Sequence, residues 1–378
     1  MKKLKYLLWG LLIVLIAGLL YVGSIIGYAM NHDFDPPPEM VLDLQGNGAA
    51  TDWNDTLNLV IWNIGYGGLG EECDFFYDQG KSVWAGSSIV RTPLPLVEKN
   101  LRGVYHYLDE IADSTDFLLL QEVDRASARS QGIDQYAQLN ERLTGFQASF
   151  AKNYDVPFVP IPLFQPMGKV VAGLGTWSKW SATEAIRFSF EGNYDWPSYL
   201  FFLDRCFVVN RYDIPGEQDL VIINTHNSAY DDGSLKQRQM EQLQGLLLEE
   251  YEKGNFVIVG GDWNQYPPDF GGWKGFEVEK SPENTNLFVS ESYPSPGWRW
   301  IYDPAVASNR LLTEPFNPDS TERLILDFYL LSPNVQSLSV QTVEMDFGFS
   351  DHHPVYLKVA LRRPIVEEDQ PMEILPLP

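Results

Sequence analysis

The chain has 378 residues, of which 44% are hydrophobic and 13% aromatic, so it can bury a substantial core and disorder throughout is excluded. Asp and Glu total 51 against 27 Lys and Arg, a net charge of −24, which argues against a protein that coats nucleic acid. Two cysteines, Cys73 and Cys206, are too few for a disulfide scaffold or a cysteine zinc site, and the sequence leaves open whether they pair.

The first thirty residues predict a membrane-directed segment. Three lysines among the first five residues are followed by an uncharged apolar stretch from Leu7 to Met30. At about 1.5 Å per residue, this stretch is long enough to cross a hydrocarbon core of roughly 30 Å. Because the basic residues precede it and acidic residues follow it, we expect the bulk of the chain to be extracytoplasmic, in the periplasm or at the cell surface. Residues 1–30 are thus interpreted as a signal anchor or a signal peptide, with a secreted protein resulting if they are cleaved.

Composition divides the remainder of the chain into three parts. Residues 31–55 contain three consecutive prolines and a Gly-Asn-Gly sequence, and are interpreted as a linker. Residues 56–362 are predicted to form one compact domain. Residues 363–378, with four prolines and four acidic residues, are interpreted as a tail.

Short apolar runs in the domain predict buried strands, and longer amphipathic segments predict helices. The runs cover 57–62, 117–121, 220–224 and 256–260, with further candidates at 323–331, 337–344 and 354–360. One helix is predicted over 96–112. A second begins at Ser234, where Gln237 would complete a capping box, and ends before Gly254. These elements predict a mixed α/β domain.

Polar motifs follow the apolar runs in chain order. They are Trp62-Asn63, Gln121-Glu122-Val123, Thr225-His226, Gly261-Asp262-Trp263-Asn264, Asp327 in a late strand, and Ser350-Asp351-His352-His353-Pro354. A single motif of this kind is usually a turn or a cap. Six of them at strand ends, where open α/β sheets place their sites, indicate a functional site.

In this order the motifs resemble the endonuclease/exonuclease/phosphatase superfamily, which includes pancreatic-type deoxyribonucleases, abasic-site endonucleases, inositol polyphosphate 5-phosphatases and neutral sphingomyelinases. The resemblance spans about Leu57 to Ala360. It implies a four-layer α/β/β/α sandwich of two packed mixed sheets, preceded here by one N-terminal transmembrane helix. It also implies a metal-dependent hydrolase of phosphate esters, with its site at one rim of the sheets.

The side chains of these motifs suit metal-dependent chemistry. Glu122 and Asn63 offer oxygen ligands for Mg²⁺, with Mn²⁺ or Ca²⁺ as alternatives, and Asp351 is a candidate second ligand or a scaffold for its neighbour. His352 fits a general base that titrates near neutral pH. The resemblance implies that Asp327 fixes the tautomer of His352.

Other motif residues are candidates for binding phosphate. Asp262 and Asn264 alternate along an extended chain, so both side chains are expected on one side, where they would orient water and hold a phosphoryl oxygen. His226 would donate to another phosphoryl oxygen. The resemblance places a phosphate-contacting arginine at Arg205. His353 is interpreted as a variable neighbour without a catalytic role.

The sequence leaves the substrate open. After residue 30 the chain holds 24 Lys and Arg against 51 Asp and Glu, a net charge of −27. This charge and the tether favour a lipid headgroup or a small phosphodiester, and no stable nucleic-acid complex is expected. A secreted or membrane-tethered nuclease acting on DNA or RNA is the alternative, whereas the lack of a dense Lys/Arg cluster disfavours an inositol phosphatase.

Two further interpretations concern specificity and activity. The Gly- and aromatic-rich segment 65–95 looks like an insertion that shapes specificity, whereas Trp298 and Trp300 are interpreted as packing residues. A catalytically inactive binding domain on the same scaffold is a hypothesis of another class. The intact His352, Glu122 and Asp262 count against it, because a pure binder needs no general base. The oligomeric state and the native metal are not determined by the sequence.

Overall fold

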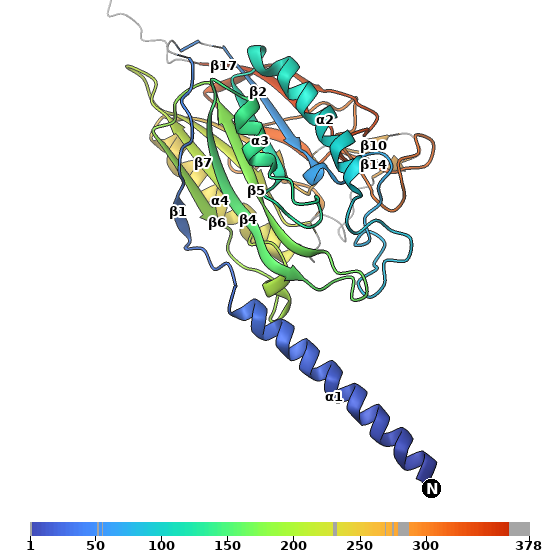
Figure 1. Cartoon of the computed structure of the whole chain (residues 1–378). Coiled ribbons are helices and arrows are strands. Elements are labelled where there is room, and N and C mark those ends of the chain that lie inside the picture. The colour runs from blue at the N-terminus through green and yellow to red at the C-terminus, as the bar shows by residue number, and fades with distance from the viewer. Residues whose placement is uncertain are drawn as a thin grey trace, which may run out of the picture.

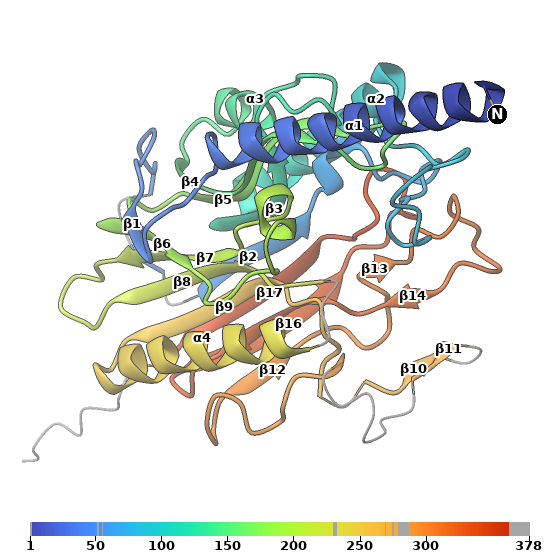
Figure 2. The ribbon, with the colours of Figure 1, turned by 90° about the horizontal axis from the view of Figure 1, so that it is seen from below.

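Two mixed β-sheets pack face to face in the computed structural model, and helices cover their outer faces (Figure 1). The structure describes residues 2–50, 53–54, 56–229, 233–268, 270–273, 276–278 and 287–362. The predicted tail at 363–378 lies outside these residues. The arrangement confirms the predicted four-layer α/β/β/α sandwich, whose layers are visible in the second view (Figure 2).

The first sheet has six strands in the order β16-β17-β2-β3-β5-β4. Its strands are β2 (Thr56–Asn63), β3 (Phe117–Asp124), β4 (Gln147–Val159), β5 (Gly168–Ser178), β16 (Val335–Thr342) and β17 (Val355–Leu361). Strands β2 and β3 are parallel, so their carboxyl ends lie at the same edge of the sheet.

The second sheet has seven strands in the order β1-β6-β7-β8-β9-β15-β12. Its strands are β1 (Glu39–Val41), β6 (Glu184–Ser189), β7 (Cys206–Tyr212), β8 (Leu220–His226), β9 (Phe256–Asp262), β12 (Arg299–Ile301) and β15 (Asp327–Leu331). Strands β8 and β9 are parallel. Two short ribbons pair β10 (Gly272–Trp273) with β11 (Phe276–Glu277) and β13 (Asn309–Arg310) with β14 (Arg323–Leu324).

The core lies between the sheets and beneath the helices. Along β2, Leu57, Leu59 and Ile61 face the other sheet, while Val60 and Trp62 pack on the helical side, as the two-residue period of a strand requires. Helices α2 (Leu94–Ile111) and α3 (Gln135–Arg142) cover the six-stranded sheet, and α4 (Ser234–Glu252) covers the seven-stranded sheet. Single-turn helices η1 (Gly65–Gly67), η2 (Ala112–Ser114) and η3 (Ser198–Phe201) lie in the connections.

The N-terminal segment forms helix α1 (Lys2–Met30), a candidate membrane span with a mean hydropathy of 2.4 in its most apolar window. Its N-terminal end extends away from the domain, and its C-terminal end contacts η3 and β4 (Figure 1). The predicted linker 31–55 is not simply a linker. Strand β1 within it pairs antiparallel with β6, and Gln45 bridges Ala148, because extended backbone beside a sheet edge can complete its hydrogen bonds.

Two predicted elements differ in detail. The run 323–331 forms two strands rather than one. The Ser308 hydroxyl accepts hydrogen bonds from the backbone N–H groups of Leu326 and Asp327 at 3.0 Å, so these two N–H groups do not bond to a neighbouring strand. At the start of α4 the N-cap is Gly233, and Gln237 donates to Glu241, so the predicted capping box is not formed.

Candidate active site

Strand pairing gathers the predicted polar residues at one rim of the sandwich. In the six-stranded sheet Asn63 is the register partner of Gln121, at the carboxyl ends of β2 and β3. In the seven-stranded sheet Asp262 pairs in register with His226 on β8 and with Asp327 on β15. Strand β15 is antiparallel to β9, so its first residue meets the last residue of β9. Both sheets therefore present polar ends to the same space.

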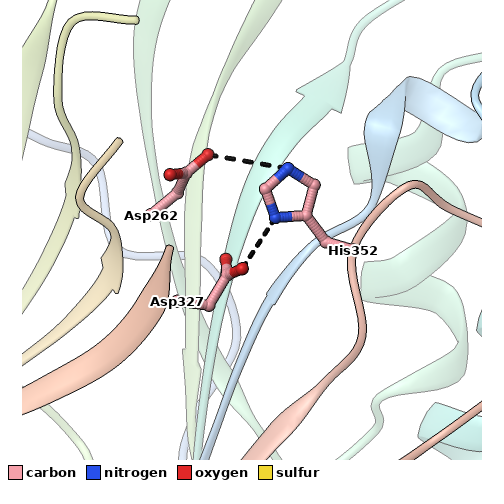
Figure 3. A group of neighbouring side chains, drawn as sticks. All are labelled: Asp262, Asp327 and His352. Carbon is pink, nitrogen blue, oxygen red and sulfur yellow. Dashed lines mark hydrogen bonds and ion pairs between the residues drawn. The ribbon is translucent and has the colours of Figure 1, made fainter. Parts of the chain in front are cut away.

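His352 lies between two carboxylates of the seven-stranded sheet (Figure 3). Its Nδ1 is 2.7 Å from Asp327 Oδ2, while its Nε2 is 3.8 Å from Asp262 Oδ2 and 3.8 Å from Asp351 Oδ2. The Ser308 hydroxyl donates to Asp327 Oδ2 at 2.8 Å, which holds that carboxylate in place. The imidazole is thus oriented by Asp327, as the resemblance implied, with Nε2 toward the remaining carboxylates.

The surroundings of His352 favour its protonated form. Burial opposes the charge, but Asp327, Asp351 and Asp262 outweigh it and raise the pKa of His352 to about 10. The sequence predicted an imidazole that titrates near neutral pH, and the difference arises because three carboxylates surround it. Asn309, which no motif pointed out, places its Nδ2 at 2.9 Å from His352 Nε2.

Asn63 connects the two sheets at the site. Its Nδ2 donates to Asp262 Oδ2 at 3.1 Å and to Glu122 Oε1 at 3.3 Å, and its Oδ1 accepts from the backbone N–H of Gly65 at 3.0 Å. The amide oxygen that was expected as a metal ligand thus faces the backbone. In this arrangement Asn63 positions two carboxylates.

Two site residues have backbone conformations that an extended strand does not provide. Glu122 has φ 55° within β3, at an irregularity in the pairing with β5, and Asn264 has φ 51°. Asn264 is therefore not in an extended conformation. Its backbone N–H donates to Asp262 Oδ1 at 2.9 Å, and its Nδ2 donates to the Asn227 carbonyl at 2.9 Å. The predicted alternation of Asp262 and Asn264 is wrong, and a turn brings them to the same cavity.

His226 and Arg205 lie on the other side of Asp262. His226 Nε2 is 3.5 Å from Asp262 Oδ2, and its buried Nδ1 has no hydrogen-bond partner among the described residues. Burial and then the Arg205 guanidinium lower the pKa of His226 well below its usual value, so the imidazole is neutral. Arg205 Nη1 donates to the His226 carbonyl at 3.4 Å.

The site holds more negative charge than its cations balance. Burial, with the repulsion of Glu122, raises the pKa of Asp351 to about 7 against the attraction of His352. Burial likewise raises the pKa of Asp262 to about 6. The buried Oδ1 of Asp327 accepts no hydrogen bond from the described residues. Clustered carboxylate oxygens with this excess charge fit a divalent cation with oxygen ligands, and Asp262, Asp327 and His352 also have ligand atoms within 4.8 Å of one another.

The rim where these side chains gather opens into a cavity of about 240 Å³. Every predicted site residue except Asn63 and Asp327 lines it, and both exceptions contact residues that do. Sequence reasoning missed Arg129, which pairs with Asp124 at 2.8 Å and stacks on the Tyr66 ring at 3.8 Å. It also missed Arg310, which is buried and donates to the carbonyls of Gly70 and Cys73 in the 65–95 segment. No spacing in the sequence pointed to either arginine.

Residues interpreted as structural have structural contacts. His353 Nδ1 is 2.8 Å from the Ala307 carbonyl, its ring stacks on Phe347, and burial lowers its pKa to about 4. Trp298 and Trp300 pack in the core beneath α4. Cys73 and Cys206 are buried free thiols.

Comparisons with known proteins concern the fold and the family. The fold resembles an endonuclease/exonuclease/phosphatase from Beutenbergia cavernae (17% identity, 81% of this chain and 72% of that chain, TM-score 0.52). It also resembles D. rerio TDP2 complexed with a single-strand DNA product (15%, 81% and 99%, TM-score 0.50) and ANGEL2, a 2′,3′-cyclic phosphatase (13%, 86% and 99%, TM-score 0.50). No curated protein matches the chain. The model of the Endonuclease/Exonuclease/phosphatase family matches residues 62–352, so the chain belongs to that family.

Proposed function

We propose that this chain is a membrane-tethered, metal-dependent hydrolase of phosphodiesters whose domain lies outside the cytoplasm. The observation that supports it best is the His352–Asp327 pair, set against the carboxylates of Asp262 and Asp351 at the inner end of a cavity. A domain that only binds has no need of an oriented buried imidazole, so this pair favours catalysis over the inactive binding domain.

Each site residue would have a separate role in hydrolysis. Glu122 and Asp351 would hold a divalent cation, which supplies polarisation of a phosphoryl oxygen and offsets the negative charge around the imidazole. With the carboxylate charge offset in this way, the imidazole of His352 would be neutral, and, held through Nδ1 by Asp327, it would take the proton of the attacking water at Nε2. His226 and Asn264 line the cavity beside Asp262, where their N–H groups would donate to the phosphoryl oxygens as charge develops.

The substrate of this hydrolase is proposed to be a lipid headgroup or a small phosphodiester. The negative charge of the chain and the candidate membrane span in α1 support this proposal. A nuclease acting on DNA or RNA is the second candidate, favoured by the likeness of the fold to D. rerio TDP2 with its single-strand DNA product.

Assays of the purified full chain test the proposal. Plasmid DNA, RNA, sphingomyelin vesicles and a chromogenic phosphodiester are each incubated with Mg²⁺, Mn²⁺ or Ca²⁺. His352→Ala and Glu122→Ala should abolish metal-dependent turnover, whereas His106→Ala, on the exposed face of α2, should retain it. Turnover that survives in either site variant contradicts the assignment. Digestion of the domain by protease added to intact cells tests the extracytoplasmic placement.

A further inference from the structure

The cavity beside the catalytic rim has one polar end and a long apolar wall. The polar end consists of the site residues, and the wall is aromatic and aliphatic. The wall includes Phe76, Tyr77, Ile161, Met167, Phe202 and Leu203. These residues come from the 65–95 segment, from the connection between β4 and β5, and from the connection between β6 and β7. The insertion predicted to shape specificity therefore contributes Phe76 and Tyr77 to the wall.

Several wall residues remain half-buried within the folded chain. Tyr77, Ile161, Phe202 and Leu203 are all in this class, although the rings of Tyr77 and Phe202 already pack edge to face at 5.8 Å. Apolar surface that folding leaves in a concave cavity is stabilised when an apolar group of a ligand covers it. The wall thus suits the apolar portion of a molecule whose phosphate lies at the rim.

The apolar wall lies at the end of the domain from which α1 extends. Helix α1 contacts η3, whose residue Phe201 also lines the cavity. Nearby, Phe34 in the chain just after α1 packs against Lys152 on β4, with the ammonium 4.3 Å from the ring centroid. Figure 1 shows η3 and the tips of the loops around residues 80 and 163 at this same end. A bilayer that holds α1 would adjoin the cavity.

Exposed aromatic side chains project from the loops at this end. Trp84 is 67% exposed, Phe164 73% and Trp196 60%. The first two loops are joined, because the backbone N–H of Phe164 donates to the Val83 carbonyl at 3.4 Å. Each loop continues into a cavity-lining residue, such as Ile161. Exposed Trp and Phe beside an apolar helix fit the interface of a membrane, where aromatic rings are favourable.

We propose that the cavity binds the hydrocarbon portion of an amphiphilic phosphodiester taken from the membrane that holds α1. The inference rests on the proposed hydrolase function and assigns its substrate class. Nucleobases also stack on aromatic rings, but the aliphatic half of this wall and the net charge of −24 favour hydrocarbon over a polyanion. Trp84 and Phe164 would lie in the lipid interface at the mouth of the cavity.

The test uses the full chain in lipid nanodiscs with Mn²⁺ or Mg²⁺ and a series of 4-nitrophenyl alkyl phosphates from methyl to octyl. Burial of each added CH₂ group should raise kcat/KM about fourfold over the first few carbons. The 4-nitrophenyl ester of thymidine monophosphate is the nucleotide arm. Equal kcat/KM across the alkyl series, or a nucleotide ester preferred over the octyl ester, would overturn the proposal while leaving the hydrolase intact.

Variants of the wall locate the effect. Phe202→Ser should reduce the ratio of octyl to methyl kcat/KM by about tenfold, and Phe202→Leu should restore most of it, because leucine keeps the wall apolar. Leu338→Ser, which changes an exposed leucine on β16, should leave both values unchanged. A ratio that Phe202→Ser does not alter contradicts the assignment of the cavity.

Binding measurements separate this proposal from the proposed function. Calorimetric titration of the nanodisc sample with ethyl phosphate and octyl phosphate does not require turnover. Tighter binding of octyl phosphate in the original chain, lost in Phe202→Ser, supports the cavity even where hydrolysis is absent and the proposed function fails. If the methyl ester is hydrolysed but ethyl phosphate and octyl phosphate bind equally well, the proposed function is supported and the proposal for the cavity is wrong.

Discussion

Asn63 at the end of β2 donates a 3.1 Å hydrogen bond to Asp262 at the end of β9, so one amide joins the two sheets of the sandwich. The same nitrogen also faces Glu122 at 3.3 Å. Two carboxylates from different sheets are thereby held around one donor. This contact helps to set the spacing of the acidic cluster, together with the 2.8 Å hydrogen bond from Gln121 on β3 to Asn224 on β8, which also joins the two sheets.

Removal of that donor should impair the site more than the fold. Asn63→Ala leaves Asp262 and Glu122 facing each other without the amide, and metal-dependent kcat/KM should fall by about 10- to 100-fold, the usual cost of losing a residue that orients ligands. Asn58→Ala is the matched control on the same strand, where the side chain accepts from Tyr356. If both variants lose activity equally, Asn63 has no positioning role.

Binding of a divalent cation should be visible without any substrate. Because the carboxylates of Glu122 and Asp351 gain a partner, saturation at about 100 times Kd should stabilise the fold by about 2.7 kcal/mol. That corresponds to a rise in Tm of about 5 °C or more. Glu122→Gln and Asp351→Asn should each remove most of the rise. Glu344→Gln, an exposed acid on the surface, should retain it.

Gly65 packs against the acidic cluster in a conformation that favours glycine. Its φ is 50°, and a Cβ there would lie 2.8 Å from Asp351 Oδ1. Gly65→Ala should therefore cost about 1 kcal/mol for the backbone, with a further loss for displacement of Asp351, and should weaken metal binding.

Gly80 provides the matched comparison, because it has φ 66° with no atom within 4 Å of its Cβ position. Gly80→Ala should show the backbone cost alone in denaturant unfolding, with unchanged metal affinity. Equal metal affinities in the two variants would mean that Asp351 does not depend on Gly65.

Asp204 should make stability depend on pH. Burial, and then repulsion by Asp33, raises the pKa of Asp204 to about 7, above its value in the unfolded chain. A raised carboxyl pKa destabilises the fold as pH rises from about 4 to 7, and the penalty is complete above that range. Asp204→Asn keeps an acceptor for Asn193, which donates to Oδ1 at 3.2 Å.

The substitution should therefore raise Tm by about 2 °C at pH 8, with solvent screening taken into account. It should have almost no effect at pH 3, where the carboxyl is largely protonated in both states. Thermal unfolding of both proteins across this range measures the difference, and a constant difference in Tm at all pH values would exclude titration of Asp204 as its cause.

Much of the architecture could be predicted because its signals are local. The runs that became β2, β3, β8 and β9 are continuous and apolar, as buried strands must be. Strand β4 was not predicted, because Lys152, Asn153 and Asp155 interrupt its alternation where the strand twists and slips register against β5. Helix α3 was too short for a clear period.

The composition of the candidate site was also accessible from the sequence, because each polar motif lies at the end or at the start of a buried strand. Asn309 and Arg310 were not, since both lie on a two-residue strand and act through partners 42 or more positions away along the chain. The turn conformation of Asn264 was missed because local alternation does not report backbone dihedrals.

The sequence by itself determined which side chains are available, the mixed α/β class and the apolar helix at the N-terminus, because hydrophobic period is a property of the chain alone. The two-sheet fold was implied by the resemblance of the ordered motifs to a known family. Only the tertiary structure decided the carboxylate surroundings that raise the pKa of His352, the inward orientation of the Asn63 amide nitrogen, and the apolar cavity beside the rim. The reason is physical: electrostatic energy and burial depend on which groups lie within a few ångströms of one another, and distant segments acquire those neighbours only when the sheets pack.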